Sequence, residues 1–295
     1  MGKVLLSLAI LLVPAAAWPA WWAENDYSFG TGRTQREALA VYTRFSRSFM
    51  GGAGASFYKN DGHDLRRVYA FRSPVTYYGR GFMLTMKPFI YPASSGTGSS
   101  AGGARLHAML PLRDPSDDNY FNLTIGGAAA RQKTPVLSPT SASGPETFSE
   151  TAFEAQIEKS YFKQFFFQLS AAGFSKSGIS RNSDPERKPG ADAVNPVMDH
   201  GELAYTGAFR PVTSLPKWTT GIQFARNMAP AYDSYIYAGY SRISFRSTSD
   251  ANSFLGGIKL KLHGSSSLDL AYNRYRINGE SGENYYKLVV QVLFK

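Results

Sequence analysis

Hydrophobic and polar residues alternate with a period of two along most of the chain, from about Ala38 to the C-terminus. The alternating segments are roughly 9 to 14 residues long, and stretches rich in Gly, Asn, Asp, Ser and Pro separate them. Because those residue types favour turns, each segment is expected to be a strand. The expected strands are 38–49, 51–60, 65–79, 82–92, 103–113, 120–132, 147–160, 163–177, 200–212, 217–228, 234–247, 253–264, 266–278 and 285–295. Regular short strands predict an all-β sandwich or barrel.

The last segment favours a barrel over a sandwich. One of its faces is wholly apolar and has an aromatic residue at each end; it consists of Tyr286, Leu288, Val290, Val292 and Phe294. A membrane-crossing strand has such an outward apolar band, flanked by aromatic rings. A soluble sandwich also alternates, with its apolar face toward a core. Aromatic residues recur near many strand ends, however, and two bilayer interfaces explain that better than a core does.

This segment resembles the C-terminal strand of Gram-negative outer-membrane β-barrel proteins, in which the barrel assembly machinery recognises a terminal aromatic preceded by alternating apolar residues. Here Phe294 is penultimate, because Lys295 follows it. The resemblance implies an all-β fold, an antiparallel transmembrane β-barrel, and the number of alternating segments gives it 12–14 strands. It also implies contact with outer-membrane lipid and lipopolysaccharide. The class includes porin-like channels, some of which form homo-oligomers. No residue in the sequence marks such an interface.

The first residues form a predicted export signal. Lys3 is followed by the apolar stretch Val4–Val13, and then by Pro14 and three alanines. This is the pattern of a secretory signal peptide, 1–17, cleaved after Ala17; an anchor helix would need a longer apolar run. The predicted organisation is therefore the signal peptide, an N-terminal periplasmic segment at 18–37, and a barrel at 38–295. The expected location after export is the outer membrane.

Composition narrows the classes further. The chain has no cysteine, which excludes a disulfide framework and a Cys-based zinc site. Charged residues make up 18%, below the roughly 25% of soluble domains. No apolar run reaches the roughly 18 residues that a membrane helix needs. No cofactor or metal is expected.

The two longest gaps between expected strands raise a difficulty of strand count. They are Lys133–Pro145 and Ser175–His200, and they follow the sixth and eighth segments. In a barrel with both termini in the periplasm, the connections after even-numbered strands should be short turns. One solution is that an early segment is wrongly divided. The other is that Tyr27–Thr31 is an additional strand with a compensating error later in the chain.

The net charge of +10 is assigned mainly to the barrel interior. Alternation places eleven basic residues on the inward side: Arg44, Arg66, Arg72, Lys87, Arg105, Arg210, Arg242, Arg246, Lys259, Lys261 and Lys287. Four acidic residues share it: Glu154, Glu158, Glu202 and Asp269. Basic rings in a pore attract anions. The sequence therefore predicts a passive channel or porin-like transporter for small, preferentially anionic solutes.

Two basic residues break the alternation of their strand. Arg274 and Arg276 lie on the same side as Leu268, Leu270 and Tyr272. A β-bulge would explain this and is the preferred interpretation. Alternatively, both point outward beyond the apolar band and meet lipopolysaccharide phosphates, for which Arg is well suited.

Two other functions remain open as alternatives. One is a barrel enzyme of the lipase or acyl-hydrolase type, and the other is a plugged structural barrel. The four histidines are His63, His107, His200 and His263, and none lies in the His-x-Ser-Asn pattern of barrel phospholipases. His63 and His200 adjoin aspartates, in a pattern more typical of turns than of active sites. No catalytic residue is therefore assigned, and scattered basic residues in an exported chain argue against nucleic acid as a partner.

Overall fold

The computed structural model describes residues 21–60, 65–93, 100–113, 118–134, 146–177, 195, 197–198, 209, 215–229, 233–246, 248–262 and 266–294. Its strands are β1 (Trp21–Gly30), β2 (Thr34–Arg44), β3 (Phe49–Asn60), β4 (Leu65–Arg72), β5 (Val75–Gly79), β6 (Phe82–Tyr91), β7 (Ser100–Arg113), β8 (Phe121–Thr134), β9 (Glu146–Tyr161), β10 (Phe165–Ser177), β11 (Pro216–Ala229), β12 (Ser234–Phe245), β13 (Ala251–Lys261), β14 (Ser267–Ile277) and β15 (Glu283–Phe294). A 3₁₀ turn, η2 (Thr31–Arg33), joins β1 to β2. Within these ranges no helix is long and apolar enough to span a membrane.

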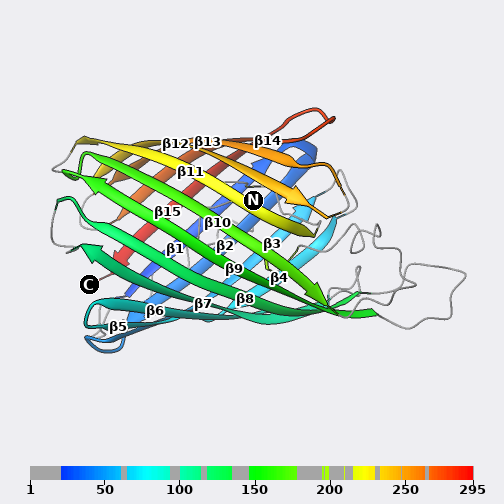
Figure 1. The fold of residues 1–295 in the computed structure, drawn as a ribbon, viewed down its shortest axis with the longest axis horizontal. Coiled ribbons are helices and arrows are strands. Elements are labelled where there is room, and N and C mark those ends of the chain that lie inside the picture. Colours follow the sequence, from blue (N-terminus) through cyan, green and yellow to red (C-terminus); the bar gives the residue numbers. More distant parts are fainter. Residues whose placement is uncertain are drawn as a thin grey trace, which may run out of the picture.

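The strands form one closed antiparallel barrel (Figure 1). Each strand pairs with its neighbours along the chain, and β1 closes the barrel by pairing with β15 from Trp21↔Phe294 to Gly30↔Tyr285. β4 and β5 share one position, because both pair with β3 on one side and with β6 on the other. The fifteen strands therefore fill fourteen positions, which confirms the predicted antiparallel barrel of 12–14 strands.

The N-terminal boundary of the barrel was predicted wrongly. Residues 18–37 do not form a separate segment, because β1 and the first residues of β2 lie within that range and pair with each other and with β15. The alternative strand at Tyr27–Thr31 is largely correct, since β1 ends at Gly30. The alternation of β1 was obscured because Asn25 lies on the apolar face, where it is paired with Val290 and Leu39.

The compensating error lies at the predicted strand 200–212. β10 pairs directly with β11, from Phe165↔Arg226 to Gly173↔Trp218, so no barrel position remains between them. Most of 200–212 lies outside the described residues, and so does the predicted signal peptide.

The connections divide into two ends of the barrel. The end that we call the loop end carries 31–33, 61–64, 92–99, 135–145, 178–215, 246–250 and 278–282. The turn end carries connections of at most seven residues, together with Trp21 and Phe294; they are 45–48, 80–81, 114–120, 162–164, 230–233 and 262–266. Both long gaps now lie opposite the termini. In bacterial barrels long loops are extracellular and short turns are periplasmic.

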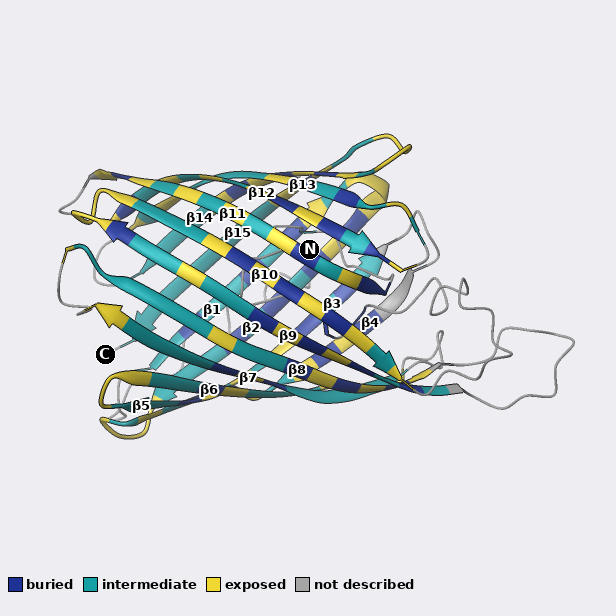
Figure 2. Cartoon of the chain, viewed as in Figure 1, coloured by how far each residue is buried: buried dark blue, intermediate teal, exposed yellow. Residues whose placement is uncertain are grey.

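Inward and outward faces alternate along every strand, as the striped burial pattern shows (Figure 2). Paired residues on neighbouring strands point to the same face, so the known face of one residue gives the face of its cross-strand partners. The outward face carries exposed large apolar side chains such as Phe153, Ile236 and Phe254. The inward face carries buried polar ones such as Glu154, Ser241 and Asn273. All five residues of the predicted assembly signal, Tyr286, Leu288, Val290, Val292 and Phe294, lie on the outward face of β15.

Candidate functional site in the barrel lumen

A row of three basic residues crosses neighbouring strands on the inward face. Lys87 of β6 is the direct cross-strand partner of Arg105 of β7. Arg72 of β4 lies diagonally next to Lys87, because its own partner on β6 is Phe89. Lys87 interacts electrostatically with both arginines and also with Glu24 and Glu154. We call Arg72, Lys87 and Arg105 the basic row.

Small residues leave space for the side chain of Arg72. Arg72 pairs with Gly54, Gly54 with Ala40, and Ala40 with Glu24, so these residues form one line across β4, β3, β2 and β1. A Cβ atom on Gly54 would lie 3.1 Å from Nε of Arg72 and 3.2 Å from Cβ of Ala40. The guanidinium therefore extends over Gly54, in the direction of Glu24.

Small inward residues also leave space on β8, where Gly126 and Ala128 lie between β7 and β9. Across them, His107 Nε2 lies 2.7 Å from Glu154 Oε2, and Arg105 Nη1 lies 3.4 Å from Glu154 Oε1. Glu154 is fully buried. A Cβ atom on Gly126 would lie only 2.2 Å from Cδ2 of His107. Glycine at 126 is therefore required for His107 to reach a carboxylate two strands away.

Part of the β10–β11 connection lies inside the lumen. Asn195 Nδ2 donates to Glu150 Oε1 at 3.1 Å, while Gln132 donates to the other oxygen of Glu150 at 2.9 Å. Arg105 donates to the backbone carbonyl of Val197. Asn195, Val197 and Met198, which we call the inserted residues, are thus attached to the inward faces of β7 and β9.

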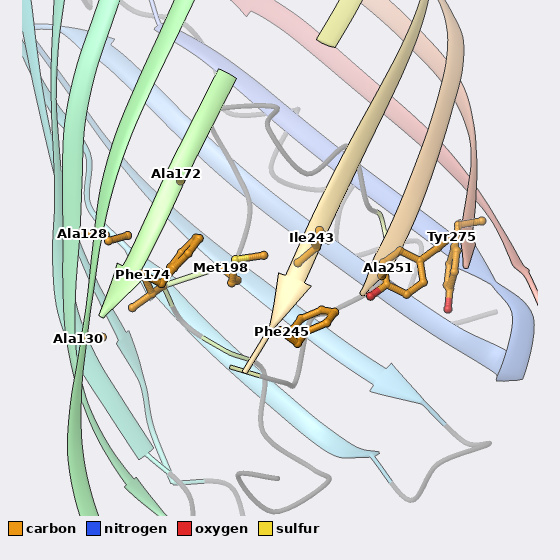
Figure 3. Packing of buried hydrophobic residues seen from close by; sticks show 12 residues of the cluster. Ala128, Ala130, Ala172, Phe174, Met198, Ile243, Phe245, Ala251 and Tyr275 are labelled. Atoms are coloured by element: carbon orange, nitrogen blue, oxygen red, sulfur yellow. The ribbon is translucent and has the colours of Figure 1, made fainter. Parts of the chain in front are cut away.

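Apolar contacts hold the inserted residues on the other side. Val197 and Met198 are 0% and 3% exposed and belong to a buried cluster with inward side chains near the loop end of the barrel. Figure 3 shows Met198 between Phe174 of β10 and Ile243 and Phe245 of β12. Because these strands lie on different parts of the wall, the inserted residues narrow the lumen.

A second charged cluster lies on β1, β2 and β15. Asp26 Oδ2 is 2.6 Å from Nη1 of Arg36 and 3.4 Å from Nζ of Lys287. Arg36 also donates from Nε to the hydroxyl of Tyr58 at 3.3 Å. This cluster connects the N-terminal hairpin to the last strand on the inside of the barrel.

The structure places the other predicted lumen residues as follows. Arg44 and Glu158 face inward near the turn end, where Arg44 lies over Tyr78 at 5.1 Å and Glu158 accepts from Tyr120. Lys259 and Lys261 face inward on β13, and Lys261 pairs with Asp233 at 2.8 Å. Arg246 follows β12 and donates to the carbonyl of Phe174. The side chain of Arg66 and all of Arg210 and Glu202 lie outside the described residues.

Arg242 is a correction, because it faces outward. Its partners across the ladder are Thr220 and Asn252, and its guanidinium lies 5.6 Å from the ring of outward-facing Trp218. On β12 the inward positions instead include Tyr235, Tyr237 and Ile243. The prediction failed because it assumed that these aromatic residues face lipid, whereas β12 directs Tyr235 and Tyr237 into the lumen.

The predicted excess of eleven bases over four acids is therefore too large. The inward face also carries Glu24, Asp26, Glu150 and Glu283, which the sequence prediction omitted, together with the additional bases Arg36 and Lys176. Several acids are bound within the wall: Asp26 by Arg36 and Lys287, Glu154 by Arg105 and His107, and Asp269 by the hydroxyl of Tyr237 at 2.6 Å. The charge of the lumen thus depends on the position of the basic row rather than on a simple count.

Sequence reasoning missed the inserted residues, His107 and the acids of the first hairpin. The acids could have been found by extending the alternation to Trp21, since Glu24, Asp26 and Ser28 occupy every second position. No periodic signal identifies Asn195, because its role depends on a fold of the connection rather than on a strand. Among the described residues, no group of three or more His, Asp or Glu side chains is arranged to hold a metal ion.

Solved structures similar to this one are outer-membrane β-barrels. The CymD monoaromatic hydrocarbon channel matches with a TM-score of 0.50 and 12% identity, over 93% of this chain and 87% of that one. CdiB from Acinetobacter baumannii matches with a TM-score of 0.50 and 11% identity, over 95% of this chain but only 61% of that one. OmpT of Vibrio cholerae matches with a TM-score of 0.49 and 8% identity, over 96% and 99%.

No protein-family model matches this chain, and no curated protein sequence does. The similarity therefore concerns the fold: the chain folds as an outer-membrane β-barrel, as its last strand and alternating body implied.

Proposed function

We propose that this protein is an outer-membrane channel for small solutes, with a preference for anions at a constriction formed by the basic row and the inserted residues. The observation that carries the proposal is the arrangement of Arg72, Lys87 and Arg105 beside a connection that narrows a fourteen-position barrel. Passive diffusion through such a lumen requires no cofactor.

The width of the barrel supports a channel over a barrel filled by its own wall. About eight strands already give an interior that side chains can fill, so fourteen positions leave space for a path. Inserted residues reduce that space without being part of the wall. Among the named neighbours, CymD is described as a channel for monoaromatic hydrocarbons, which is consistent with a transport role for this fold.

The electrostatics support a preference for anions. Three cations on neighbouring strands add their potentials at the same depth of the lumen, where the low-dielectric wall focuses the field. The carboxylate of Glu154 is bound to Arg105 and His107, and that of Glu150 accepts from two side-chain amides. Each of these two carboxylates therefore accepts from at least one side chain of the wall. The basic row extends from Arg105 through Lys87 to Arg72, which lies farther from both acids along the sheet.

The test is a measurement of reversal potential in a planar lipid bilayer under a KCl gradient. Wild-type protein should conduct with chloride more permeant than potassium. Arg72→Glu combined with Lys87→Glu should lower the chloride-to-potassium permeability ratio by roughly fivefold to tenfold, since each charge near a passing ion contributes on the order of 1 kcal/mol in water. The matched control is Arg131→Glu with Lys133→Glu, two exposed residues on the outward face of β8, which should keep the wild-type ratio.

Each alternative result has a distinct meaning. A wild-type protein that does not conduct would refute the channel and favour a plugged barrel. A conducting protein that selects cations, or one whose selectivity is the same in the lumen variant and the control, would refute the role of the basic row.

A further inference from the structure

Three arginines gather on the outer surface at the loop end of the barrel. β14 pairs residue by residue with β13 from Ser267 to Ile277 and with β15 from Ser267 to Tyr275, without a register shift. The β-bulge expected from the sequence is therefore wrong. Arg274 and Arg276 therefore lie on the outward face of β14, which also carries the exposed Tyr272.

The third arginine lies next to them across one strand. Asn252 of β13 pairs with Arg242 of β12 on one side and with Arg276 of β14 on the other. All three arginines are close to the ends of their strands, beside the connections 246–250 and 278–282. We call Arg242, Arg274 and Arg276 the outer arginine patch.

A layer of aromatic rings borders the patch, and Phe254 of β13 is the direct cross-strand partner of Arg274. Tyr240 and Phe254 are in contact with ring centroids 5.0 Å apart, and Tyr272 contacts Tyr286 at 5.6 Å. Tyr286 in turn contacts Phe29 at 5.4 Å. The hydroxyl of Tyr240 donates to Asn252 at 2.6 Å and that of Tyr272 to Asn284 at 2.7 Å. Aromatic girdles of this kind mark the level of lipid headgroups, so the arginines lie at or above that level.

The guanidinium groups are available to a ligand. Arg274 and Arg276 are exposed, and neither forms a hydrogen bond or an ion pair with the described residues. Arg242 is half-exposed and donates from Nε and Nη2 to Asp250 at 3.1 and 2.7 Å. These hydrogen bonds hold the pKa of the Asp250 carboxyl below its usual value, and they use Nε and Nη2 of Arg242 but not Nη1.

The turn end has outward cations of a different arrangement. Lys159 lies 5.8 and 5.3 Å from the rings of Phe121 and Tyr161, and Arg226 lies 5.9 Å from that of Phe165. Each of these cations is placed singly over aromatic rings. A cluster of guanidinium groups is found on β12 and β14 at the loop end, which faces the outer leaflet in the orientation deduced from loop length.

We propose that the outer arginine patch binds the phosphate groups of lipopolysaccharide in the outer leaflet. Arg presents paired N–H donors that match phosphate oxygens in a bidentate geometry, while the neighbouring aromatic rings pack against the lipid. This inference rests on the outer-membrane location proposed above, but not on conductance or selectivity.

The experiment measures binding of lipid A to the purified protein in detergent by native mass spectrometry. The probes are bisphosphorylated lipid A, lipid A without phosphates, and phosphatidylglycerol. Arg274→Gln combined with Arg276→Gln should weaken binding of bisphosphorylated lipid A by about tenfold or more, since hydrogen bonds to charged groups are among the stronger ones. The matched control is Lys159→Gln with Arg226→Gln, which removes two outward cations at the turn end and should bind as the wild type does.

The expected result also includes little binding of dephosphorylated lipid A to the wild type. Equal binding of bisphosphorylated lipid A to the patch variant and to the wild type would overturn the proposal. So would phosphatidylglycerol binding as tightly as lipid A and with the same dependence on the patch, because the site would then be a general one for anionic headgroups. Heat-modifiable gel migration verifies folding of each variant, and bilayer conductance of the same samples separates failure of this proposal from failure of the channel.

Discussion

At the scale of single residues, small side chains on the inner wall decide which charges can meet. Gly126 lies between His107 and Glu154, and any side chain there would occupy the space of the imidazole. Gly54 has the same role beneath Arg72. The contacts between charged groups of the inner wall therefore depend on the glycines and alanines that lie between them.

Substitution of Gly126 tests this dependence. Gly126→Ala should destabilise the barrel by about 2 kcal/mol, because a Cβ atom would displace His107 from Glu154 and press on the carbonyl of Leu106. Gly173→Ala is the control, since a Cβ atom there meets nothing within 4 Å; it should be neutral or stabilise by roughly 0.5 kcal/mol. Urea unfolding in lipid vesicles measures both. Equal effects of the two substitutions would contradict the proposed role of Gly126.

At the scale of elements, one side chain both shapes the inserted residues of the β10–β11 connection and attaches them to the wall. Oδ1 of Asn195 accepts from the backbone N–H groups of Val197 and Met198 at 3.0 and 3.1 Å, while Nδ2 donates to Glu150. Asn195 therefore both shapes the inserted residues and attaches them to β9. The hydrogen bond from Arg105 to the carbonyl of Val197 and the apolar cluster around Met198 add to the attachment.

Removal of this amide should widen the path. Asn195→Ala deletes three hydrogen bonds of about 1 kcal/mol each, so the inserted residues should leave the wall more often and the single-channel conductance should rise. Asn122→Ala, which truncates an inward asparagine of β8, is the matched control and should conduct as the wild type does. A conductance that stays unchanged in Asn195→Ala would show that the inserted residues do not limit the path.

Strand type was predictable from the sequence, because alternation and turn residues are local signals. The count of fourteen segments matched the barrel only because the missed strand β1 and the additional segment 200–212 compensate each other. The faces of most strands were predictable from the same local signals, as for Lys259 and Lys261 opposite Phe254. The face of β12 was not, since its tyrosines and arginines can each occupy either an interface or a lumen. The inserted residues were not predictable either, because their position depends on contacts with β7, β9, β10 and β12, which are distant in sequence.

At the scale of the whole molecule, the barrel is closed by the pairing of its first and last strands. Ten residue pairs join β1 to β15, and the rings of Trp21 and Phe294 stack at 4.0 Å at the turn end. Asp26 reinforces this junction from inside through Lys287. The interior is thereby separated from lipid along its full circumference.

Closure can be tested by a cross-link, because the chain has no native cysteine. Ala23 and Val292 are cross-strand partners, so Ala23→Cys with Val292→Cys should form a disulfide on oxidation and change the gel migration of the denatured chain under non-reducing conditions. Ala23→Cys with Ala171→Cys places the second thiol on β10, which is not adjacent to β1 in the sheet, and should not cross-link within one molecule. An absence of cross-linking in the first pair would contradict the closed barrel.

The junction between β1 and β15 also has a consequence for the order of folding. Most other neighbouring strands are joined by short connections, so they can form as local hairpins while the rest of the chain is unstructured. The pairing of Trp21 with Phe294 instead requires both extremities of the barrel sequence to meet, at a large cost in chain entropy. Contacts of such high sequence separation slow folding. The rate of barrel formation should therefore be governed at this one seam, after the hairpins have assembled into an open, curved sheet.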